Sequence, residues 1–279
     1  SNHQYITSEK FGMTSKVVLI TGASSGIGLA TAELLHEAGF IVYGTSRRAN
    51  SASKYKFHLI ELDVNNDDSV NHAIEKVIQN EGRIDVLINN AGFAIAPAGA
   101  EESSMQQAQA IFDTNFFGAV RMTRAVLPVM REQKSGLILN ISSILGLLPT
   151  PFGALYSASK HALEGYSESL DHELRSQGIR VSLIEPAYTK TSLGINLLEA
   201  DAKVSAYDHI REKLHQQMIK SINKSDDPSV VAKTILTVIN SQNILPRYTS
   251  GKAAKHLKNL RKFAPVKIFD TLIQRSLKV

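Results

Sequence analysis

The sequence predicts an α/β fold in which one doubly wound parallel sheet carries helices on both faces. Short β-rich runs alternate with helical stretches through most of the 279 residues. The first run, KVVLIT at 16–21, is apolar almost throughout, as expected of a strand buried on both faces. No repeat, low-complexity tract or linker divides the chain, so we expect a single domain over 16–279 after a loose arm at 1–15.

The individual elements follow from local signals. The helix predicted at 27–39 ends at a glycine, and the one at 67–82 begins with two aspartates and also ends at a glycine. A long helical region at 103–133 contains Pro128, which we expect to kink or interrupt it. A further helix holds Tyr156 and ends at Gly178, and an insertion near 190–225 and a helical extension at 252–279 complete the chain. Strands are predicted at 16–21, 40–46, 57–64, 84–92, 136–143 and 179–186.

The composition excludes several classes of protein. Cysteine is absent, which rules out disulfides, thiol catalysis and cysteine metal sites. No apolar run approaches the roughly 20 residues of a membrane span and no secretory signal is visible, so we expect a cytoplasmic protein without membrane contact. The net charge is +5, but no zinc-finger spacing or aromatic RNA-binding signature accompanies it, and we expect no nucleic acid partner.

Much of the positive charge lies near the C-terminus, in GKAAKHLKNLRKFAPVK at 251–267. The tail is amphipathic as well as basic, and such a segment can rest on an anionic membrane surface. Because Pro265 interrupts it, we favour packing on the domain or on a partner subunit. No motif points to a metal, and we expect His161 and His172 to be surface or core residues, not ligands.

A glycine-rich loop, TGASSGIG, joins the first strand to the first helix. Gly22 allows a tight turn, and Gly26 and Gly28 let the backbone approach a pyrophosphate at the helix N-terminus. The spacing G-x3-G-x-G differs from the commoner G-x-G-x-x-G, but its place between strand and helix is the required context. The predicted dinucleotide contacts in this loop are Gly22, Ser24, Ser25, Gly26, Ile27 and Gly28.

The end of the second strand discriminates between cofactors. NAD binders usually place Asp or Glu there to accept from the ribose hydroxyl, but no acidic residue lies between Glu37 and Glu61. Arg47 and Arg48 stand there instead, and a guanidinium fork suits a 2′-phosphate. Two arginines after a strand could also be solvated loop charges. Because the acidic residue typical of NAD binders is missing, we predict NADP(H) in preference to NAD(H).

Tyr156 and Lys160 lie four residues apart, so they share one face of the predicted helix. A free tyrosine has a pKa near 10, whereas an acid/base catalyst works best with a pKa near the working pH. A lysine ammonium one turn away, helped by an oxidised nicotinamide, is a plausible cause of a lowered pKa.

Seven motifs now stand in order along the chain: TGASSGIG, LDV, NNAG, the asparagine of DTNFFG, ISSILG, YSASK and EPAYTKT. Together they resemble the short-chain dehydrogenase/reductase family over about residues 16–191. The layout, with its basic C-terminal helix, is similar to the 17β-hydroxysteroid and retinol dehydrogenase branch. The resemblance implies a Rossmann-type fold and a homodimer or homotetramer formed through the helices near 103–133 and 156–177.

The resemblance also implies catalytic roles. Tyr156 would exchange a proton with the substrate oxygen, and Lys160 would bind the nicotinamide ribose and lower the tyrosine pKa. Ser143 would hydrogen-bond the same oxygen; its neighbour Ser142 is the rival, but the spacing to Tyr156 favours Ser143. Asn115 would support a water relay to Lys160, or else be a residue of a helix kink.

Further cofactor contacts are implied along the chain. Asp63 and Val64 would touch the adenine, Asn90, Ala91 and Gly92 would line the cleft, and Pro186, Thr189 and Thr191 would hold the nicotinamide end. One departure concerns the turn after the sixth strand, where the family often has Pro-Gly and this chain has Pro186-Ala187.

The substrate loops are rich in Ile, Leu, Phe and Pro, which suggests an apolar pocket for a small or bulky hydrophobic ketone or alcohol. The candidates are 93–99, 144–152 and a helical lid within 190–225, although their apolar residues could also cover the core. We predict an NADP(H)-dependent carbonyl reductase or alcohol dehydrogenase. The alternatives are a 3-oxoacyl thioester reductase and a catalytically silent dinucleotide sensor or scaffold. The predicted substrate-lining residues are Phe93, Leu145, Leu148 and Phe152.

Overall fold

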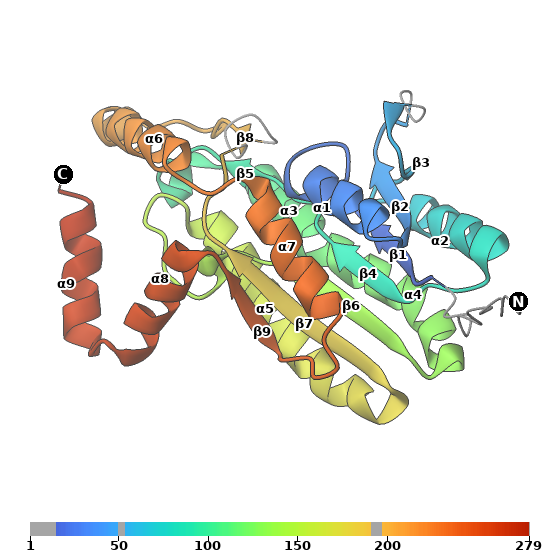
Figure 1. The fold of residues 1–279 in the computed structure, drawn as a ribbon. Helices are drawn as coiled ribbons and strands as arrows, with labels where there is room; N and C mark the ends of the chain where they lie inside the picture. The colour runs from blue at the N-terminus through green and yellow to red at the C-terminus, as the bar shows by residue number, and fades with distance from the viewer. Residues whose placement is uncertain (1–14, 50–53, 191–196, 279) are drawn as a thin grey trace, which may run out of the picture.

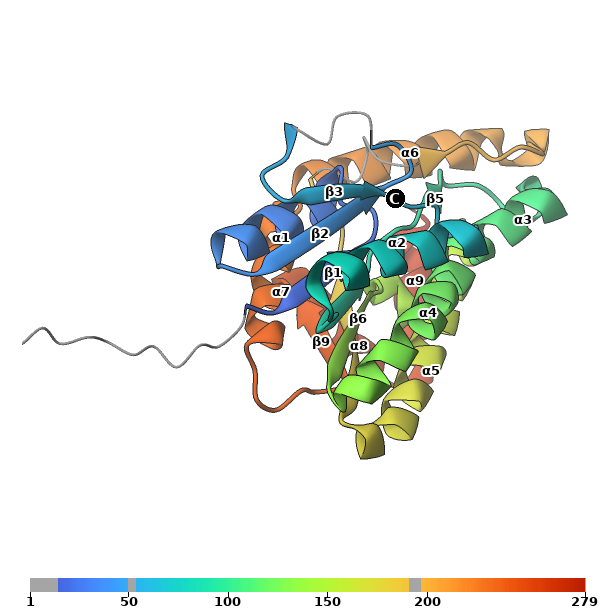
Figure 2. The same ribbon diagram turned by 90° about the vertical axis from the view of Figure 1, so that its right-hand side faces the viewer.

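The computed structural model describes residues 15–49, 54–190 and 197–278, and it confirms the predicted fold class. Seven strands form one parallel sheet in the order β3-β2-β1-β4-β6-β7-β9. Figures 1 and 2 show helices on both faces of this sheet. The strands are β1 (Val17–Ile20), β2 (Ile41–Ser46), β3 (His58–Glu61), β4 (Val86–Asn89), β6 (Gly136–Ile141), β7 (Ile179–Pro186) and β9 (Arg247–Ser250).

Alternate side chains of each strand enter two separate hydrophobic layers. Val17 and Leu19 pack with residues of α2 (Asp67–Glu81), α4 (Gly118–Gln133) and α5 (Ala154–Leu174). Val18 and Ile20 pack on the other face, with residues of α1 (Gly26–Glu37) and α7 (Pro228–Ile239). All four strand side chains are almost completely buried, which explains the unbroken apolar run in the sequence.

The long helical region is interrupted at a different place from the one predicted. Helix α3 (Met105–Phe112) passes into a π-helical turn, Asp113–Phe117, before α4 begins. Pro128 lies inside α4 without ending it, so the expected interruption there is wrong. Pro128 has no N–H to donate to the carbonyl oxygen of Arg124, one turn earlier in the helix. Both residues are exposed, so water can hydrogen-bond to that oxygen.

The structure adds elements that the sequence analysis did not assign. A seventh strand, β9, pairs with β7 at the sheet edge and follows α7. A separate two-stranded parallel sheet joins β5 (Ala94–Ile95) to β8 (Leu197–Leu198), which ties the substrate loop to the insertion. The insertion continues into α6 (Asp208–Asn223). Short 3-10 helices lie at Ala100–Glu102, Ile144–Gly146, Arg175–Gln177 and Ser205–Tyr207.

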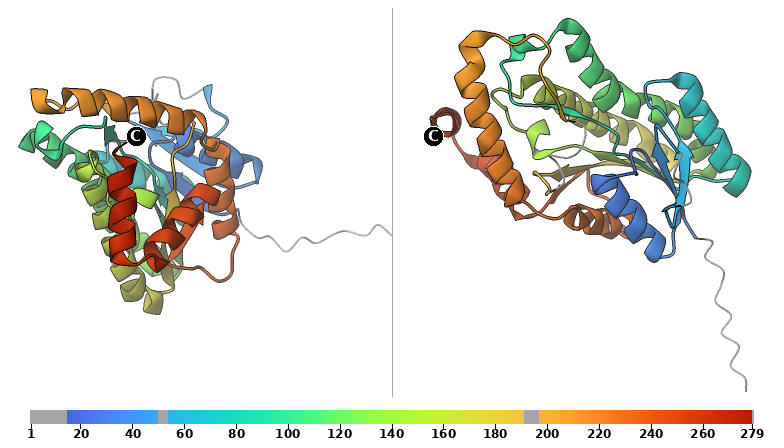
Figure 3. Two further views of the ribbon diagram at one scale, coloured as in Figure 1. Left: turned by 90° about the vertical axis from the view of Figure 1, so that its left-hand side faces the viewer. Right: turned by 90° about the horizontal axis from the view of Figure 1, so that it is seen from above.

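Two helices, α8 (Lys252–Phe263) and α9 (Val266–Ser276), form the C-terminal extension. They lie at the opposite end of the molecule from α2 and β3, as Figures 1 and 3 show. Ala254 and Phe269 pack against Ile144 and Leu148, so one side of the extension covers the loop after β6. Within the described ranges, no helix is both long and apolar enough to cross a membrane.

The strand order reverses between β1 and β4. In sheets of this kind the crevice beyond the carboxyl ends of two such strands is where ligands bind. The glycine loop follows β1, and Asn90, Ala91 and Gly92 follow β4, so the topology brings these two predicted segments together.

Candidate active site

Three glycines of the first loop are required, for two different reasons. Gly22 and Gly26 have φ of +65° and +58°, the left-handed region that glycine adopts at no steric cost. A Cβ on Gly28 would lie 2.0 Å from the carbonyl oxygen of Gly22 and 2.6 Å from Nδ2 of Asn90. The absence of a side chain at Gly28 therefore allows the glycine loop to pack closely on helix α1. This close packing leaves the N-terminus of α1 accessible.

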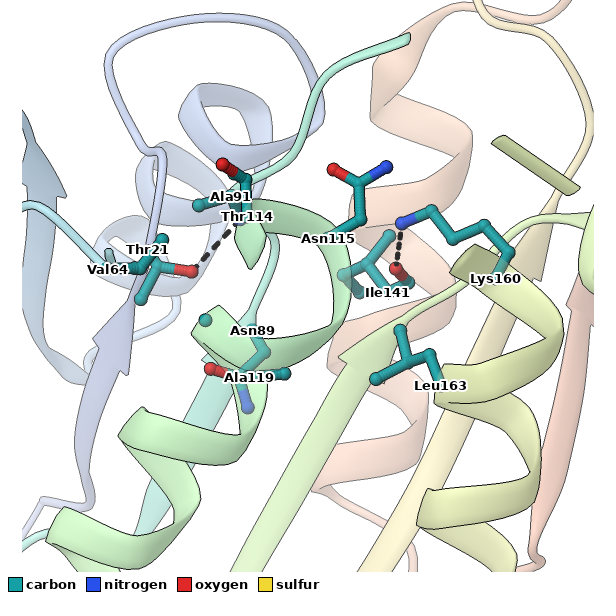
Figure 4. A pocket seen from close by; sticks show the side chains of 11 residues that line it. Thr21, Val64, Asn89, Ala91, Thr114, Asn115, Ala119, Ile141, Lys160 and Leu163 are labelled. Atoms are coloured by element: carbon teal, nitrogen blue, oxygen red, sulfur yellow. Dashed lines mark hydrogen bonds between the residues drawn. The ribbon is translucent and has the colours of Figure 1, made fainter. Parts of the chain in front are cut away.

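Thr21, which the sequence analysis did not single out, holds the two loops together. Its Oγ1 accepts hydrogen bonds from the backbone N–H groups of Asn90 (2.9 Å) and Ala91 (3.0 Å). The Asn90 side chain donates to the carbonyl oxygens of Thr21 and Gly22 at 3.2 and 3.0 Å. Asn90 and Ala91 thus have clear local structural roles in addition to any contact with a cofactor. Figure 4 shows Thr21 and Ala91 at the wall of a pocket that reaches Lys160.

The N-terminus of α1 is suited to an anion. Ser25 is the N-cap, its side chain makes no capping hydrogen bond, and the first turn holds no acidic residue. Ser24 is half-buried and its carbonyl oxygen accepts from Tyr55 at 3.4 Å, while Ile27 packs on the core. The loop therefore offers backbone donors at the place where a pyrophosphate would lie.

The residues predicted around the adenine end lie along the same edge of the sheet. Arg47 and Arg48 are exposed just beyond β2. Asp63 is half-buried and accepts from the backbone of Asn65 at 2.9 Å. Val64 is buried against α4, where a Cβ on Gly118 would lie 2.8 Å from its side chain.

Ser143 and Tyr156 come together where β6 ends and α5 begins. The Ser143 hydroxyl lies close enough to the Tyr156 phenol to affect its pKa. Burial raises the pKa of Tyr156 to about 12, the Ser143 hydroxyl opposes this shift, and nearby Tyr188 adds to it. The direction is opposite to the predicted acidification. The phenol therefore holds its proton at neutral pH.

Lys160 explains why the tyrosine is not acidified. Its Nζ lies 5.8 Å from the centre of the Tyr156 ring and donates a 3.0 Å hydrogen bond to the carbonyl oxygen of Ile141, as Figure 4 shows. Burial also lowers the pKa of Lys160 to about 8, against the effect of the Glu164 carboxylate. An ammonium group aimed at a backbone oxygen and not at the phenol leaves burial as the dominant influence on the Tyr156 pKa.

Asn115 lies in the π-helical turn and is fixed on both sides of its amide. Its Oδ1 accepts from the Phe93 N–H, and its Nδ2 donates to the Phe93 carbonyl, both at 2.9 Å, and to Ser159 Oγ at 3.2 Å. A Cβ on Gly92 would lie 3.0 Å from that Oδ1 and 3.9 Å from Nζ of Lys160. Asn115 therefore joins three predicted segments beside Lys160.

The small residues between Tyr156 and Lys160 hold the loop after Ser143. Ser157 Oγ contacts the carbonyl oxygens of both Leu145 and Leu148 at 2.8 Å. Ser142 is buried, and its Oγ lies 3.4 Å from the Ser143 carbonyl oxygen. From the sequence, Ser157 is only a small residue that lets cofactor and helix come close together, and its hydrogen bonds to the loop were not predicted.

The predicted substrate-lining residues separate into two groups. Phe93 and Phe152 are half-buried, and Phe152 packs edge-to-face on Tyr207 with ring centres 6.1 Å apart. Phe152 also has a φ of +63°, an uncommon conformation for a bulky side chain. Leu145 and Leu148 instead pack beneath the C-terminal helices, and Leu148 is almost completely buried, which matches the alternative that these residues cover the core.

A buried ion pair fastens the insertion to the substrate loop. Glu102 is fully buried, and its Oε1 lies 2.8 Å from Nε of Arg211 on α6. The Glu102 carboxylate also accepts from the backbone N–H groups of Gly99 (2.7 Å) and Val204 (3.0 Å). Burial raises the pKa of Glu102, but these hydrogen bonds and the Arg211 charge outweigh it, and the pKa is lowered overall.

A second buried acidic group lies behind α5. Glu164 and Glu185 are almost inaccessible, and Arg247 of β9 pairs with Glu164 at 2.9 Å and with the exposed Glu168 at 2.6 Å. Burial and the neighbouring Glu164 carboxyl group raise the pKa of Glu185 to about 9, although Arg247 opposes them. Across the ranges that the structure covers, no group of three or more acidic or histidine side chains is arranged to hold a metal ion.

The nicotinamide end of the predicted site is only partly described. Pro186 ends β7 and Thr189 is buried, with its backbone bridged to Asp226, whereas Thr191 lies outside the described residues. Ala187 replaces the usual glycine without strain, since it is absent from the described residues with positive φ, and it packs near Ile144. Tyr188, 41% exposed and close enough to affect Tyr156, is a further candidate substrate contact within EPAYTKT.

Comparisons with known proteins agree with this geometry. The short chain dehydrogenase family model matches residues 16–202. The chain is 48% identical over 188 residues to 3-ketodihydrosphingosine reductase of Bacteroides thetaiotaomicron, covering 66% of this chain and 68% of that protein. It is 34% identical over 281 residues to the uncharacterized oxidoreductase YusZ of Bacillus subtilis, covering 95% and 99%.

Solved structures are also similar to this chain over most of its length. A short-chain dehydrogenase from Streptomyces avermitilis superimposes with a TM-score of 0.79 at 33% identity, covering 90% of this chain and 95% of the other. ElxO, solved with NADP bound, gives a TM-score of 0.71 at 28% identity, covering 85% and 97%.

The fold and the site define an oxidoreductase of the doubly wound α/β class. The chain belongs to the short-chain dehydrogenase family. The predicted family is confirmed, and so is its relationship to the retinol and steroid dehydrogenase-like branch.

Proposed function

We propose that this chain uses NADPH to reduce a ketone carried on a long hydrophobic chain, with Tyr156 as the proton donor. The observation that carries the proposal is the Ser143 hydroxyl beside the Tyr156 phenol, with Lys160 Nζ 5.8 Å from the same ring, beyond the carboxyl ends of the strands. Hydride transfer is the chemistry that the nicotinamide cofactor supplies when bound. The protein positions the carbonyl and delivers the proton.

The protonation state of Tyr156 suits the reductive direction. A phenol with a pKa of about 12 is protonated at neutral pH and can donate to a carbonyl oxygen as negative charge develops there. The Ser143 hydroxyl can donate to the same oxygen and keep it in line with the phenol. Lys160, which is cationic below about pH 8, would stabilise the phenolate that remains once its Nζ turns from the Ile141 carbonyl oxygen toward the phenol.

The preference for NADP(H) rests on Arg47 and Arg48, exposed beyond β2 where a 2′-phosphate would lie. The NADP-bound ElxO structure supports this proposal. We expect Arg47→Ala to weaken NADPH binding by more than about tenfold and to leave NADH binding little changed. Fluorescence titration with both cofactors tests this, with Lys76→Ala on α2 as a charge control. Equal losses for NADPH and NADH would contradict the phosphate contact.

The substrate class follows from the half-buried Phe93 and Phe152, the exposed Tyr188 and the relative named 3-ketodihydrosphingosine reductase. That name describes a ketone on a long alkyl chain, which an apolar pocket would accommodate. The alternative substrate, a 3-oxoacyl thioester, shares the ketone but adds a large polar carrier.

The deciding experiment is an NADPH-oxidation screen with 3-ketodihydrosphingosine, a 3-oxoacyl thioester, a steroid ketone and a small water-soluble ketone. We expect the first to give the highest kcat/KM, and Tyr156→Phe to remove turnover while NADPH binding changes less than about threefold. A preference for the thioester would select the alternative. If wild type oxidises NADPH with none of them, a dinucleotide sensor or scaffold is favoured.

A further inference from the structure

The C-terminal hairpin, α8 and α9 with the turn between them, has one covered side and one exposed side. Ala254 and Phe269 are buried on the covered side. The exposed side carries Phe263, Val266, Ile268 and Leu272, which are 72%, 81%, 54% and 38% exposed. Four large apolar side chains within ten residues form an exposed group that is uncommon on a solvated surface.

The hairpin also concentrates the positive charge of the protein. Residues 252–278 hold eight lysines and arginines and one aspartate, a net charge of +7, whereas the whole chain carries +5. The remainder of the protein is therefore negative overall. The exposed apolar turn, Phe263 to Val266, lies between the cations Arg261 and Lys262 on one side and Lys267 on the other.

We propose that this hairpin docks on an anionic lipid surface. Apolar side chains at the turn would enter the boundary between headgroups and acyl chains, while the flanking lysines and arginines remain among the anionic headgroups. The sequence alone favoured packing on the domain or a partner, without membrane contact. The structure shows that packing on the domain covers one side of the hairpin and leaves the apolar turn exposed.

The charge distribution favours a lipid surface over a second copy of the chain. A two-fold symmetric contact would place the same patch against itself and bring two groups of net charge +7 together. An anionic bilayer instead attracts each lysine and arginine near its surface.

The position of the hairpin assigns a role in substrate delivery to the lipid contact. This role rests on the proposed function. The covered side packs on Ile144 and Leu148, which lie in the loop directly after Ser143. A docked hairpin would therefore bring the substrate loops close to the bilayer. A ketone on a long alkyl chain could then reach the site without crossing water.

Vesicle co-sedimentation tests the proposal without any need for catalysis. We expect the full chain to bind vesicles of phosphatidylcholine mixed with phosphatidylserine, to bind phosphatidylcholine alone at least tenfold more weakly, and to be released by high salt. Phe263→Ser combined with Val266→Ser, and separately Lys262→Gln combined with Lys267→Gln, should each weaken binding by about tenfold or more. Turnover of a water-soluble ketone should not change.

Matched variants control for general effects of hydrophobicity and charge. Leu245→Ser removes another exposed apolar side chain, and Lys16→Gln combined with Lys76→Gln removes two distant charges; both should bind as wild type does. No dependence on phosphatidylserine, or undiminished binding by the turn variant, would overturn the proposal. A turn variant that halves the molar mass in light scattering, with no vesicle binding by wild type, would identify a subunit interface. An inactive wild type that still binds vesicles would count only against the proposed function.

Discussion

Glu164 lies one helical turn after Lys160 on α5, and the two side chains have opposite charges in a buried setting. Burial lowers the pKa of Lys160 to about 8, and the Glu164 carboxylate opposes that shift. The Glu164 carboxylate is itself paired with Arg247 at 2.9 Å. The charge of Lys160 therefore depends on Glu164, which is itself held by Arg247 of β9.

Glu164→Gln should make Lys160 lose its proton at a lower pH. Without the carboxylate, burial acts unopposed, and we expect the alkaline limb of the kcat/KM profile to move down by about half a pH unit to one unit. Glu168→Gln is the control, because Glu168 contacts the same arginine from the solvent side. If the alkaline limb moved equally in both variants, the effect would come through Arg247 and not from a direct charge contact between Glu164 and Lys160.

We expect Glu185 to make the free energy of unfolding decrease as the pH rises. It keeps its proton up to about pH 9 in the folded chain, whereas an unfolded glutamate releases it near pH 4. Between these values the folded state binds more protons, so the free energy of unfolding decreases with pH. Glu185→Gln should reduce this slope and raise the free energy of unfolding at about pH 8 by about 1 kcal/mol or more. Urea unfolding at about pH 5 and pH 8 measures it; an unchanged slope would contradict the assignment.

Gly28→Ala should abolish dinucleotide binding. The added Cβ would lie 2.0 Å from a backbone oxygen, so the loop must move away from the helix N-terminus. Gly165→Ala is the matched control, because nothing lies within 4 Å of its Cβ and it sits inside α5. The control should bind NADPH normally and gain about 0.5 to 1 kcal/mol of stability. Calorimetric titration would refute the packing argument if both variants bound alike.

Arg211→Met should loosen the insertion over the substrate loop. It leaves the buried Glu102 without its cation, and we expect KM for the ketone to rise by about tenfold or more while NADPH affinity is unchanged. Tyr207→Phe removes only the hydroxyl that contacts exposed Glu101 and should change KM by less than about threefold. Steady-state kinetics distinguish the two; a matching loss of NADPH affinity would mean that the whole cleft is disturbed.

The parts of the fold with strong local signals were predictable. β1 is apolar on both faces, and α2 has an N-terminal asparagine cap and ends at the left-handed Gly82, so the sequence marks both within a few residues. β9 was missed because RYTS is short and polar and is stabilised by pairing with β7, a contact between distant parts of the chain. The π-helical turn at 113–117 likewise has no sequence signal comparable to a proline.

The predicted site residues came from motifs, and the structure brings most of the described ones to one edge of the sheet. The local electrostatics could not be predicted in the same way. The pKa of Tyr156 depends on how deeply the phenol is buried and on the direction of Lys160 Nζ, and neither can be derived from a spacing of four residues. Glu102 and Arg211 are far apart in sequence, and each alone looks like an ordinary surface charge.

Arg247, which pairs with Glu164 of helix α5, lies beyond residue 202, where the match to the family model ends. A protein truncated after residue 202, where the family match ends, would keep Ser143, Tyr156 and Lys160. It would lose the Arg247 guanidinium, which pairs with Glu164 and lies 4.0 Å from Glu185, together with the edge strand β9 that carries it. The part of the chain after residue 202 thus supports helix α5, and the segment up to residue 202 alone should be inactive or unfolded.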